Sequence, residues 1–142
     1  MKIAIVTNVT EPEATGQTTH RLAAEMISSG HEVWIVTTAN FNYETDDSIS
    51  AYARTVPPGK YESASDFIDV LKSDKAINKT VTVNELDVLL LRNNPSVQSA
   101  WAQGIGVAFG RQAKRHGVIV LNDPDGLSKA MNKMYLQSFP PE

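Results

Sequence analysis

The chain has 142 residues, a formal net charge of −3 and no cysteine. This length is enough for one domain with a buried core, and the lack of cysteine excludes disulfides, thiolate metal sites and a cysteine nucleophile. No apolar run approaches the ~20 residues that span a bilayer, and no signal-peptide pattern opens the chain. The negative charge gives no reason to expect nucleic acid as a partner. We therefore expect a cytoplasmic globular domain.

The start of the chain predicts a strand–helix–strand unit. Residues 2–7 form an apolar strand, and a polar loop follows it. Thr18 or Thr19 can cap the next helix, and Gly30 is suited to end it in a left-handed conformation. Residues 31–37 then form a second strand, at the spacing of a parallel crossover connection.

The middle of the chain is less regular. Residues 40–50 are polar and predict an exposed segment. Residues 51–56 alternate as a strand does, and the Pro-Pro-Gly run at 57–59 ends them. Residues 65–71 predict a short helix, and residues 79–83 predict a strand of modest length.

The last third of the chain alternates again between strands and helices. Residues 87–91 and 118–121 are short apolar runs typical of buried parallel strands. A helix is predicted between them, and its apolar positions are Val97, Trp101, Ile105 and Ala108. One final amphipathic helix is predicted after them, with apolar positions Leu127, Ala130, Met131, Met134 and Tyr135.

This alternation predicts one α/β domain over residues 1–142, with a three-layer, mostly parallel, Rossmann-like open sheet. Ligands of such sheets bind at the carboxyl ends of the strands. Three polar segments follow predicted strands there: residues 7–8, 92–94 and 122–123. They are far apart in the sequence, and we expect them to converge on one rim.

Arg92 is the most informative single residue, because it directly follows a buried strand. A guanidinium at that place can bind a carboxylate or phosphate through two parallel hydrogen bonds, although a surface arginine paired with a nearby aspartate would look the same. Asn8, Asn93 and Asn122 offer neutral donors and acceptors at strand ends, but asparagine is also common in turns. Thr18 opens a helix whose free N–H groups could bind an anion, or it is simply a cap.

Other motifs do not support chemistry on this chain. Gly104, Gly106 and Gly110 superficially match part of a dinucleotide fingerprint, but they lie inside a predicted helix, so close helix packing is the expected cause. The three histidines have no spacing typical of a metal site. No nucleophile elbow is present. We therefore predict no catalytic residue and no metal ligand here.

Two late motifs resemble bacterial glutathione synthetases. The run Leu-Asp-Val-Leu-Leu-Leu-Arg-Asn-Asn-Pro at 86–95 is similar to their strand and arginine-containing turn. Residues 122–127, followed by Asn-Lys-Met-Tyr at 132–135, are similar to their Asn-x-Pro-x-x-Leu and Asn/Glu-Lys-Leu-Tyr/Phe segments at the same spacing. Residues 51–56 and 17–19 also resemble segments of that family, so the similarity covers nearly the whole chain.

The resemblance implies a pre-ATP-grasp domain, the N-terminal lobe of an ATP-dependent carboxylate–amine ligase. In that family the arginine matching Arg92 faces a peptide-like substrate, and the lysine matching Lys133 contacts an ATP phosphate. The reaction phosphorylates a carboxylate, and an amine then attacks the acyl phosphate. We expect ATP and Mg²⁺ in the parent protein and neither bound to this domain alone.

Two further observations refine this expectation. The family usually has Lys-Asp after the arginine, where this chain has Asn93 and Asn94, so a different acceptor substrate is plausible. The chain stops at Glu142, where the family continues into the ATP-grasp core. We therefore expect a lobe that is inactive alone and works with C-terminal ATP-grasp domains on a small peptide or amino-acid-like substrate. A homo-oligomer stays open.

Two alternatives also stay open. Residues 30–37 are similar to the opening of two-domain glycosyltransferases, although residues 14–16 lack their Gly-Gly pair and that family does not explain residues 132–135. The other alternative is a non-enzymatic Rossmann-like module for dimerisation or small-ligand binding. Such a module would have an exposed apolar face and would not depend on a partner domain.

Overall fold

The computed structural model describes residues 1–8, 18–93, 100–130 and 133–140. One six-stranded sheet runs through it in the order β4-β3-β2-β1-β5-β6. β2, β1, β5 and β6 are parallel, whereas β3 and β4 pair antiparallel at one edge. The strands are β1 (Lys2–Thr7), β2 (Glu32–Tyr43), β3 (Ile49–Thr55), β4 (Ile77–Thr82), β5 (Val88–Leu91) and β6 (Ile119–Leu121).

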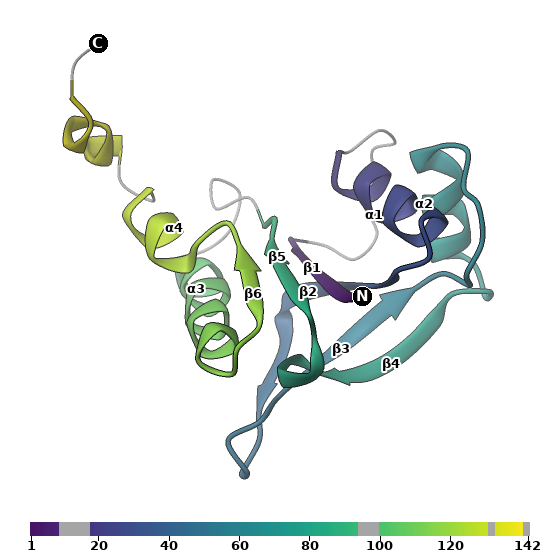
Figure 1. Cartoon of the computed structure of the whole chain (residues 1–142), viewed down its shortest axis with the longest axis horizontal. Coiled ribbons are helices and arrows are strands. Elements are labelled where there is room, and N and C mark those ends of the chain that lie inside the picture. The colour runs from purple at the N-terminus through teal and green to yellow at the C-terminus, as the bar shows by residue number, and fades with distance from the viewer. Residues whose placement is uncertain (9–17, 94–99, 131–132, 141–142) are drawn as a thin grey trace.

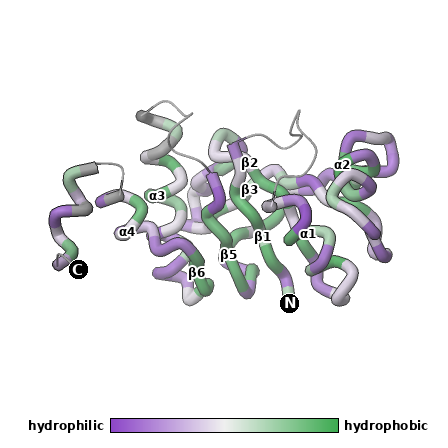
Figure 2. The backbone as a smooth tube through the Cα atoms, turned by 90° about the horizontal axis from the view of Figure 1, so that it is seen from above, coloured by the Kyte–Doolittle hydropathy of each residue, from purple (hydrophilic) through white to green (hydrophobic). Residues whose placement is uncertain are grey.

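Helices cover both faces of the sheet, which confirms the three-layer, mostly parallel α/β fold (Figure 1). None of the helices in the described segments is long and apolar enough to cross a bilayer. Figure 2 shows the apolar residues concentrated in the central strands, with hydrophilic segments toward the outside. The helices are α1 (Thr18–Ser28), α2 (Ala64–Lys72), α3 (Ala100–Arg115) and α4 (Pro124–Ala130), with two 3-10 helices, η1 (Val83–Glu85) and η3 (Lys133–Ser138).

Side chains of β1 alternate between two cores, as the pleat of a strand requires. Ile3 and Ile5 face the core under α1 and α2, and Ala4 and Val6 face the core on the α3 side. All four side chains are at most 4% exposed. β1 therefore lies at the centre of the molecule, buried on both faces.

The core under α1 and α2 depends on well-formed helix ends. Ser63 and Asp66 form a reciprocal capping box at the start of α2, with both side chain–backbone hydrogen bonds at 3.1 Å. The buried face of this helix carries Phe67, which is fully buried. At the end of α1, Gly30 adopts φ 85°, as predicted for the left-handed cap. α2 confirms the helix predicted at residues 65–71.

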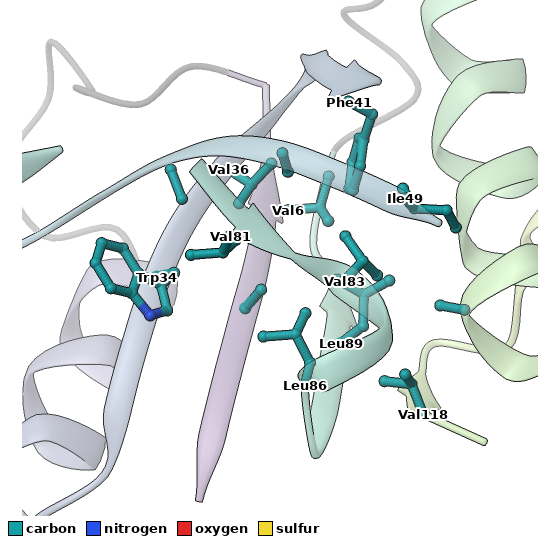
Figure 3. Packing of buried hydrophobic residues seen from close by; sticks show 14 of the residues in the cluster. Val6, Trp34, Val36, Phe41, Ile49, Val81, Val83, Leu86, Leu89 and Val118 are labelled. Atoms are coloured by element: carbon teal, nitrogen blue, oxygen red, sulfur yellow. The ribbon is translucent and has the colours of Figure 1, made fainter. Parts of the chain in front are cut away.

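The core on the α3 side explains why residues 40–50 are exposed only in part: residues 42–47 are exposed as predicted, whereas Phe41, Ile49 and Ser50 are buried. β2 continues through Tyr43 after an irregularity in its pairing between Val36 and Phe41, and β3 begins at Ile49. Phe41 is buried, and its ring stacks on Phe109 of α3 with centroids 4.6 Å apart. Figure 3 shows Phe41 among the aliphatic side chains of this core. The buried Phe41 ring therefore packs this end of β2 against α3.

The inward face of α3 also differs from the predicted one. Ala108 is exposed, while Ile105 packs partly against the core as expected. The buried positions of the helix are small or short: Ala102, Gly106, Val107, Gly110 and Ala113. The predicted Val97 and the side chain of Trp101 lie outside the described residues.

The predicted final helix is wrong as a single α-helix. The described residues form α4, which ends at Ala130, and then the separate 3-10 helix η3. Met134, predicted to face inward, is 59% exposed. The ring of Tyr135 packs edge-on against Phe139 instead of against the sheet, with centroids 5.2 Å apart. Met131 lies outside the described residues.

Candidate functional site

The carboxyl ends of three neighbouring strands meet at one edge of the sheet. β5 lies between β1 and β6, with Val6 opposite Leu91 and Leu90 opposite Leu121. Because all three strands are parallel, the residues that follow them share this edge. The convergence expected for residues 7–8, 92–94 and 122–123 is therefore confirmed for all of them except residue 94, which lies outside the described part of the chain. We call residues 7–8, 92–93 and 122–123 the rim.

Arg92 occupies the middle of the rim. Its side chain is exposed, whereas Leu91 immediately before it is 1% exposed. The Arg92 backbone N–H donates to the Val6 carbonyl at 2.9 Å, so the strand pairing with β1 extends to this residue. Among the described residues no carboxylate forms an ion pair with its guanidinium. The simple alternative of a surface Arg–Asp pair is thus not found within the described part of the chain.

Asn93 lies beside the backbone of α3. A β-carbon built on Gly106 would come within 3.3 Å of Asn93 Nδ2 and 3.4 Å of its Oδ1. The Asn93 side chain is half-buried there. The absence of a side chain at Gly106 therefore leaves the space that the Asn93 amide occupies.

Asn122 joins the end of β6 to the end of β5. Its backbone has φ 59°, a left-handed conformation that asparagine tolerates better than most residues. Its side-chain amide Nδ2 donates to the Leu91 carbonyl at 2.7 Å. A predicted substrate ligand thus has a structural hydrogen bond to the strand that carries Arg92.

Asp123 fixes the start of α4. Its carboxylate accepts from the Gly126 N–H at 3.0 Å, and Pro124 takes the first helical position. Lys114 of α3 donates to the other carboxylate oxygen at 2.6 Å. The Lys114 hydrogen bond, helped by the Gly126 N–H, holds the pKa of Asp123 below its usual value. The same hydrogen bond raises the pKa of Lys114.

The remaining predicted residues are placed only in part. Asn8 follows β1 at the rim and is half-buried. Thr18 is the exposed first residue of α1, but the loop before it at 9–17 lies outside the described residues, so the predicted anion site stays a prediction. Lys133 begins η3, and its side chain also lies outside the description. Its expected contact with ATP stays a prediction.

The glycines of α3 were only partly interpreted correctly from sequence. Close packing is confirmed at Gly110, where a β-carbon would lie 2.8 Å from Leu91 Cδ1 and 3.2 Å from Pro124 Cβ. It is also confirmed at Gly106, but a β-carbon on Gly104 would meet no atom within 4 Å from the other described parts of the chain. Gly106 and Gly110 are four residues apart on one helix face, a signal that could have linked them to the rim.

The grooves formed by the described residues lie elsewhere. One of 410 Å³ lies between Tyr43 and the α3 residues Phe109 and Arg115, and another of 450 Å³ lies near Trp34 and Ile77. Residues 9–17 and 94–99, which follow two of the rim segments in the chain, are outside the description. We therefore define the candidate site by the rim residues and not by a cavity.

The fold and rim define a Rossmann-like α/β domain with its polar residues at the carboxyl ends of parallel strands. Residues 1–128 match the family model of the prokaryotic glutathione synthetase N-terminal domain. The match spans most of the 142 residues, so the chain belongs to this family. Among curated proteins, none matches the chain.

Proposed function

We propose that this domain is the substrate-side lobe of an ATP-dependent carboxylate–amine ligase, and that Arg92 binds a carboxylate of a small peptide or amino-acid-like substrate. The observation that carries the proposal is the exposed guanidinium at the middle of the rim, next to a peptide unit hydrogen-bonded to β1 on one side and to the Asn122 side chain on the other. Membership of the glutathione synthetase N-terminal family supports it. It also favours a ligase over the glycosyltransferase alternative.

A guanidinium suits this role because its planar fork matches the two oxygens of a carboxylate. Two charge-assisted hydrogen bonds fix both the position and the plane of the bound group. In the proposed reaction the substrate's other, reacting carboxylate accepts a phosphoryl group from ATP, and the amine displaces phosphate from the resulting acyl phosphate. Arg92 keeps the substrate in the same position and orientation during both steps.

ATP and Mg²⁺ belong to the proposal only through the parent protein, where they supply the phosphoryl group and offset its charge. Within the described residues no group of three His, Asp or Glu side chains is arranged to hold a metal ion. Lys133 is the residue proposed to reach an ATP phosphate from this lobe. The work assigned to the described residues is therefore to bind and orient the carboxylate.

Neutral side chains beside Arg92 set the expected substrate preference. Asn93 lies against α3 and offers an amide where a lysine would place a positive charge. Asn8 and Asn122 are neutral as well, so Arg92 supplies the positive charge among the predicted ligands of the rim. We expect a substrate that presents one carboxylate to this edge and uncharged polar groups around it.

A binding experiment on the chain tests the carboxylate site. We expect glutathione, the product that the family name states, to shift the backbone NMR signals of the rim. Arg92→Ala should weaken binding at least about tenfold, because it removes a charge-assisted hydrogen-bonded pair. Arg92→Lys should restore part of the affinity, since it keeps the charge but not the fork. Arg115→Ala is the matched control, because Arg115 is an exposed arginine of α3 that, in the described part of the chain, donates to Gln112 of its own helix.

Two results would contradict the proposal. One is an Arg92→Ala variant that binds glutathione as tightly as the unaltered chain. The other is a parent protein that fails either of two expectations. Its gene should continue past codon 142 into an ATP-grasp core, and its product should release ADP only when carboxylate and amine are both present. A stop codon at that point would favour the small-ligand binding module instead.

A further inference from the structure

We propose that Asn122 is a positioning residue that orients Arg92 by holding the peptide unit before it, and that it does not contact the substrate. This inference rests on the proposed function, because it assigns Asn122 a task in carboxylate binding by Arg92. Its basis is the geometry at the ends of β1, β5 and β6. The substrate-binding role predicted for Asn122 from the sequence is thereby replaced by an indirect one.

The peptide unit between Leu91 and Arg92 is held from both sides. Its N–H, on Arg92, donates to the Val6 carbonyl of β1 at 2.9 Å. Its carbonyl, on Leu91, accepts from Asn122 Nδ2 at 2.7 Å. The plane of this peptide fixes the position of the Arg92 Cα atom, from which the side chain leaves the strand. Two opposed hydrogen bonds therefore hold the base of the Arg92 side chain before a substrate arrives.

Asn122 provides this second bond because the β6 backbone has turned away. The pairing of β5 with β6 ends at Leu90 and Leu121. At Asn122 the backbone enters the left-handed region, and its side chain reaches back to the strand that its main chain has left. The side-chain amide thus adds one more hydrogen bond at the end of the ladder, next to the residue proposed to bind substrate.

The left-handed turn at Asn122 is itself held in place. The next residue, Asp123, caps α4 through the Gly126 N–H and receives Lys114 from α3. A left-handed conformation is unfavourable for a non-glycine residue unless its surroundings fix it. Here two helices fix the residue that follows, so the Asn122 side chain is directed at Leu91.

The packing of α3 restricts the same strand end from a third direction. Gly110 leaves room for Leu91, and Gly106 leaves room for Asn93, so the residues on both sides of Arg92 lie against one helix face. Arg92 between them remains exposed. A fixed backbone below an exposed guanidinium reduces the freedom that is lost on binding, and this is how a supporting residue raises affinity.

Asn122→Gly is the test, because glycine adopts the left-handed backbone without strain and removes the side chain that carries the amide donor. Asp47→Gly is a matched control: Asp47, in the β2–β3 turn, has φ 64°, and its carboxylate accepts a hydrogen bond of 2.7 Å from the Tyr43 hydroxyl at the end of β2. We expect Asn122→Gly to raise the glutathione dissociation constant about fivefold, the factor of one neutral hydrogen bond. Asp47→Gly should leave it unchanged.

A double-mutant cycle separates positioning from direct contact. If Asn122 acts through Arg92, adding Asn122→Gly to Arg92→Ala causes no further loss of binding. If the two effects add, Asn122 contacts the substrate itself, and the inference is overturned. It is also overturned if Asn122→Gly binds normally while Arg92→Ala does not.

A second measurement tests the positioning role of Asn122 even if Arg92 does not bind a carboxylate. Should Arg92→Ala bind as tightly as the unaltered chain, the proposed function fails. The positioning role of Asn122 is then decided without any ligand, by hydrogen exchange of the Arg92 backbone N–H and by the heteronuclear NOE of Arg92 Nε. The role is supported if the Arg92 N–H exchanges at least about tenfold faster in Asn122→Gly and the NOE of Arg92 Nε is lower. Unchanged values refute it.

Discussion

The glycines of α3 allow the packing at the rim to be tested inside one helix. Gly104→Ala places a methyl group on an exposed position, where the described segments outside its own helix bring no atom within 4 Å. Gly110→Ala places it 2.8 Å from Leu91 Cδ1 and 3.2 Å from Pro124 Cβ. Both changes are the same replacement in the same helix, so the gain in helix propensity is common to both.

The expected free energies follow from these distances. Replacing a mid-helix glycine by alanine favours the helix by about 0.8–1 kcal/mol, so Gly104→Ala should stabilise the chain by up to that amount. At Gly110 the methyl group must displace a leucine that is 1% exposed and a rigid proline ring. Overpacking of this kind costs about 1–3 kcal/mol. Gly110→Ala should therefore be about 1–3 kcal/mol less stable than Gly104→Ala.

Urea unfolding followed by circular dichroism measures this difference, provided that the m-value is unchanged. Thermal unfolding should separate the variants by about 4–10 °C for a domain of this size. The reasoning is refuted if Gly110→Ala is as stable as Gly104→Ala, because Leu91 and Pro124 would then yield without loss. In that case α3 would not restrict the strand end that carries Arg92.

Three further predictions concern ion pairing, capping and the core. Lys114→Met should raise the pKa of Asp123 toward its usual value of about 4, as a carboxyl-carbon NMR titration would show. Because folding lowers this pKa, the Lys114–Asp123 pair stabilises the fold at pH values above the pKa of Asp123 in the unfolded chain. This stabilisation is lost as the pH falls through the pKa of Asp123 in the folded chain. Ser63→Ala should destabilise by about 1 kcal/mol in urea, because the Asp66 N–H loses its acceptor, and an unchanged midpoint would contradict the capping box. Phe67→Ala should cost about 3–5 kcal/mol by the same assay, and a loss below 1 kcal/mol would show that the core can collapse around the site.

The parallel part of the fold was predictable because each of its segments carries a local signal. β1 was predicted with its observed bounds, and the short apolar run before Arg92 correctly indicated a buried strand. The capping residues of α2 and the left-handed Gly30 are also local, since each depends on neighbours a few residues away. These features need no knowledge of the rest of the chain.

The errors occur where distant residues decide the local structure. Residues 40–50 were predicted as a polar, exposed segment, yet the first four belong to β2, where Phe41 stacks on Phe109, far along the chain. The face of α3 was assigned to its large apolar residues, whereas close approach to β5 requires the small ones, with Gly110 against Leu91. Periodicity counts hydrophobic side chains and misses a face that is defined by their absence.

The candidate site shows the same division. Parallel strands must bring their carboxyl ends to one edge, so the convergence of Asn8, Arg92 and Asn122 follows from the strand pattern alone. The sequence does not show that Asn122 turns left-handed and directs its amide at a carbonyl 31 positions earlier. That bond requires β5 and β6 to be neighbours and β6 to end one residue before Asn122. Residue type thus predicts which side chains reach the rim, but only the pairing of the strands distinguishes a residue that binds a ligand from one that holds another residue in place.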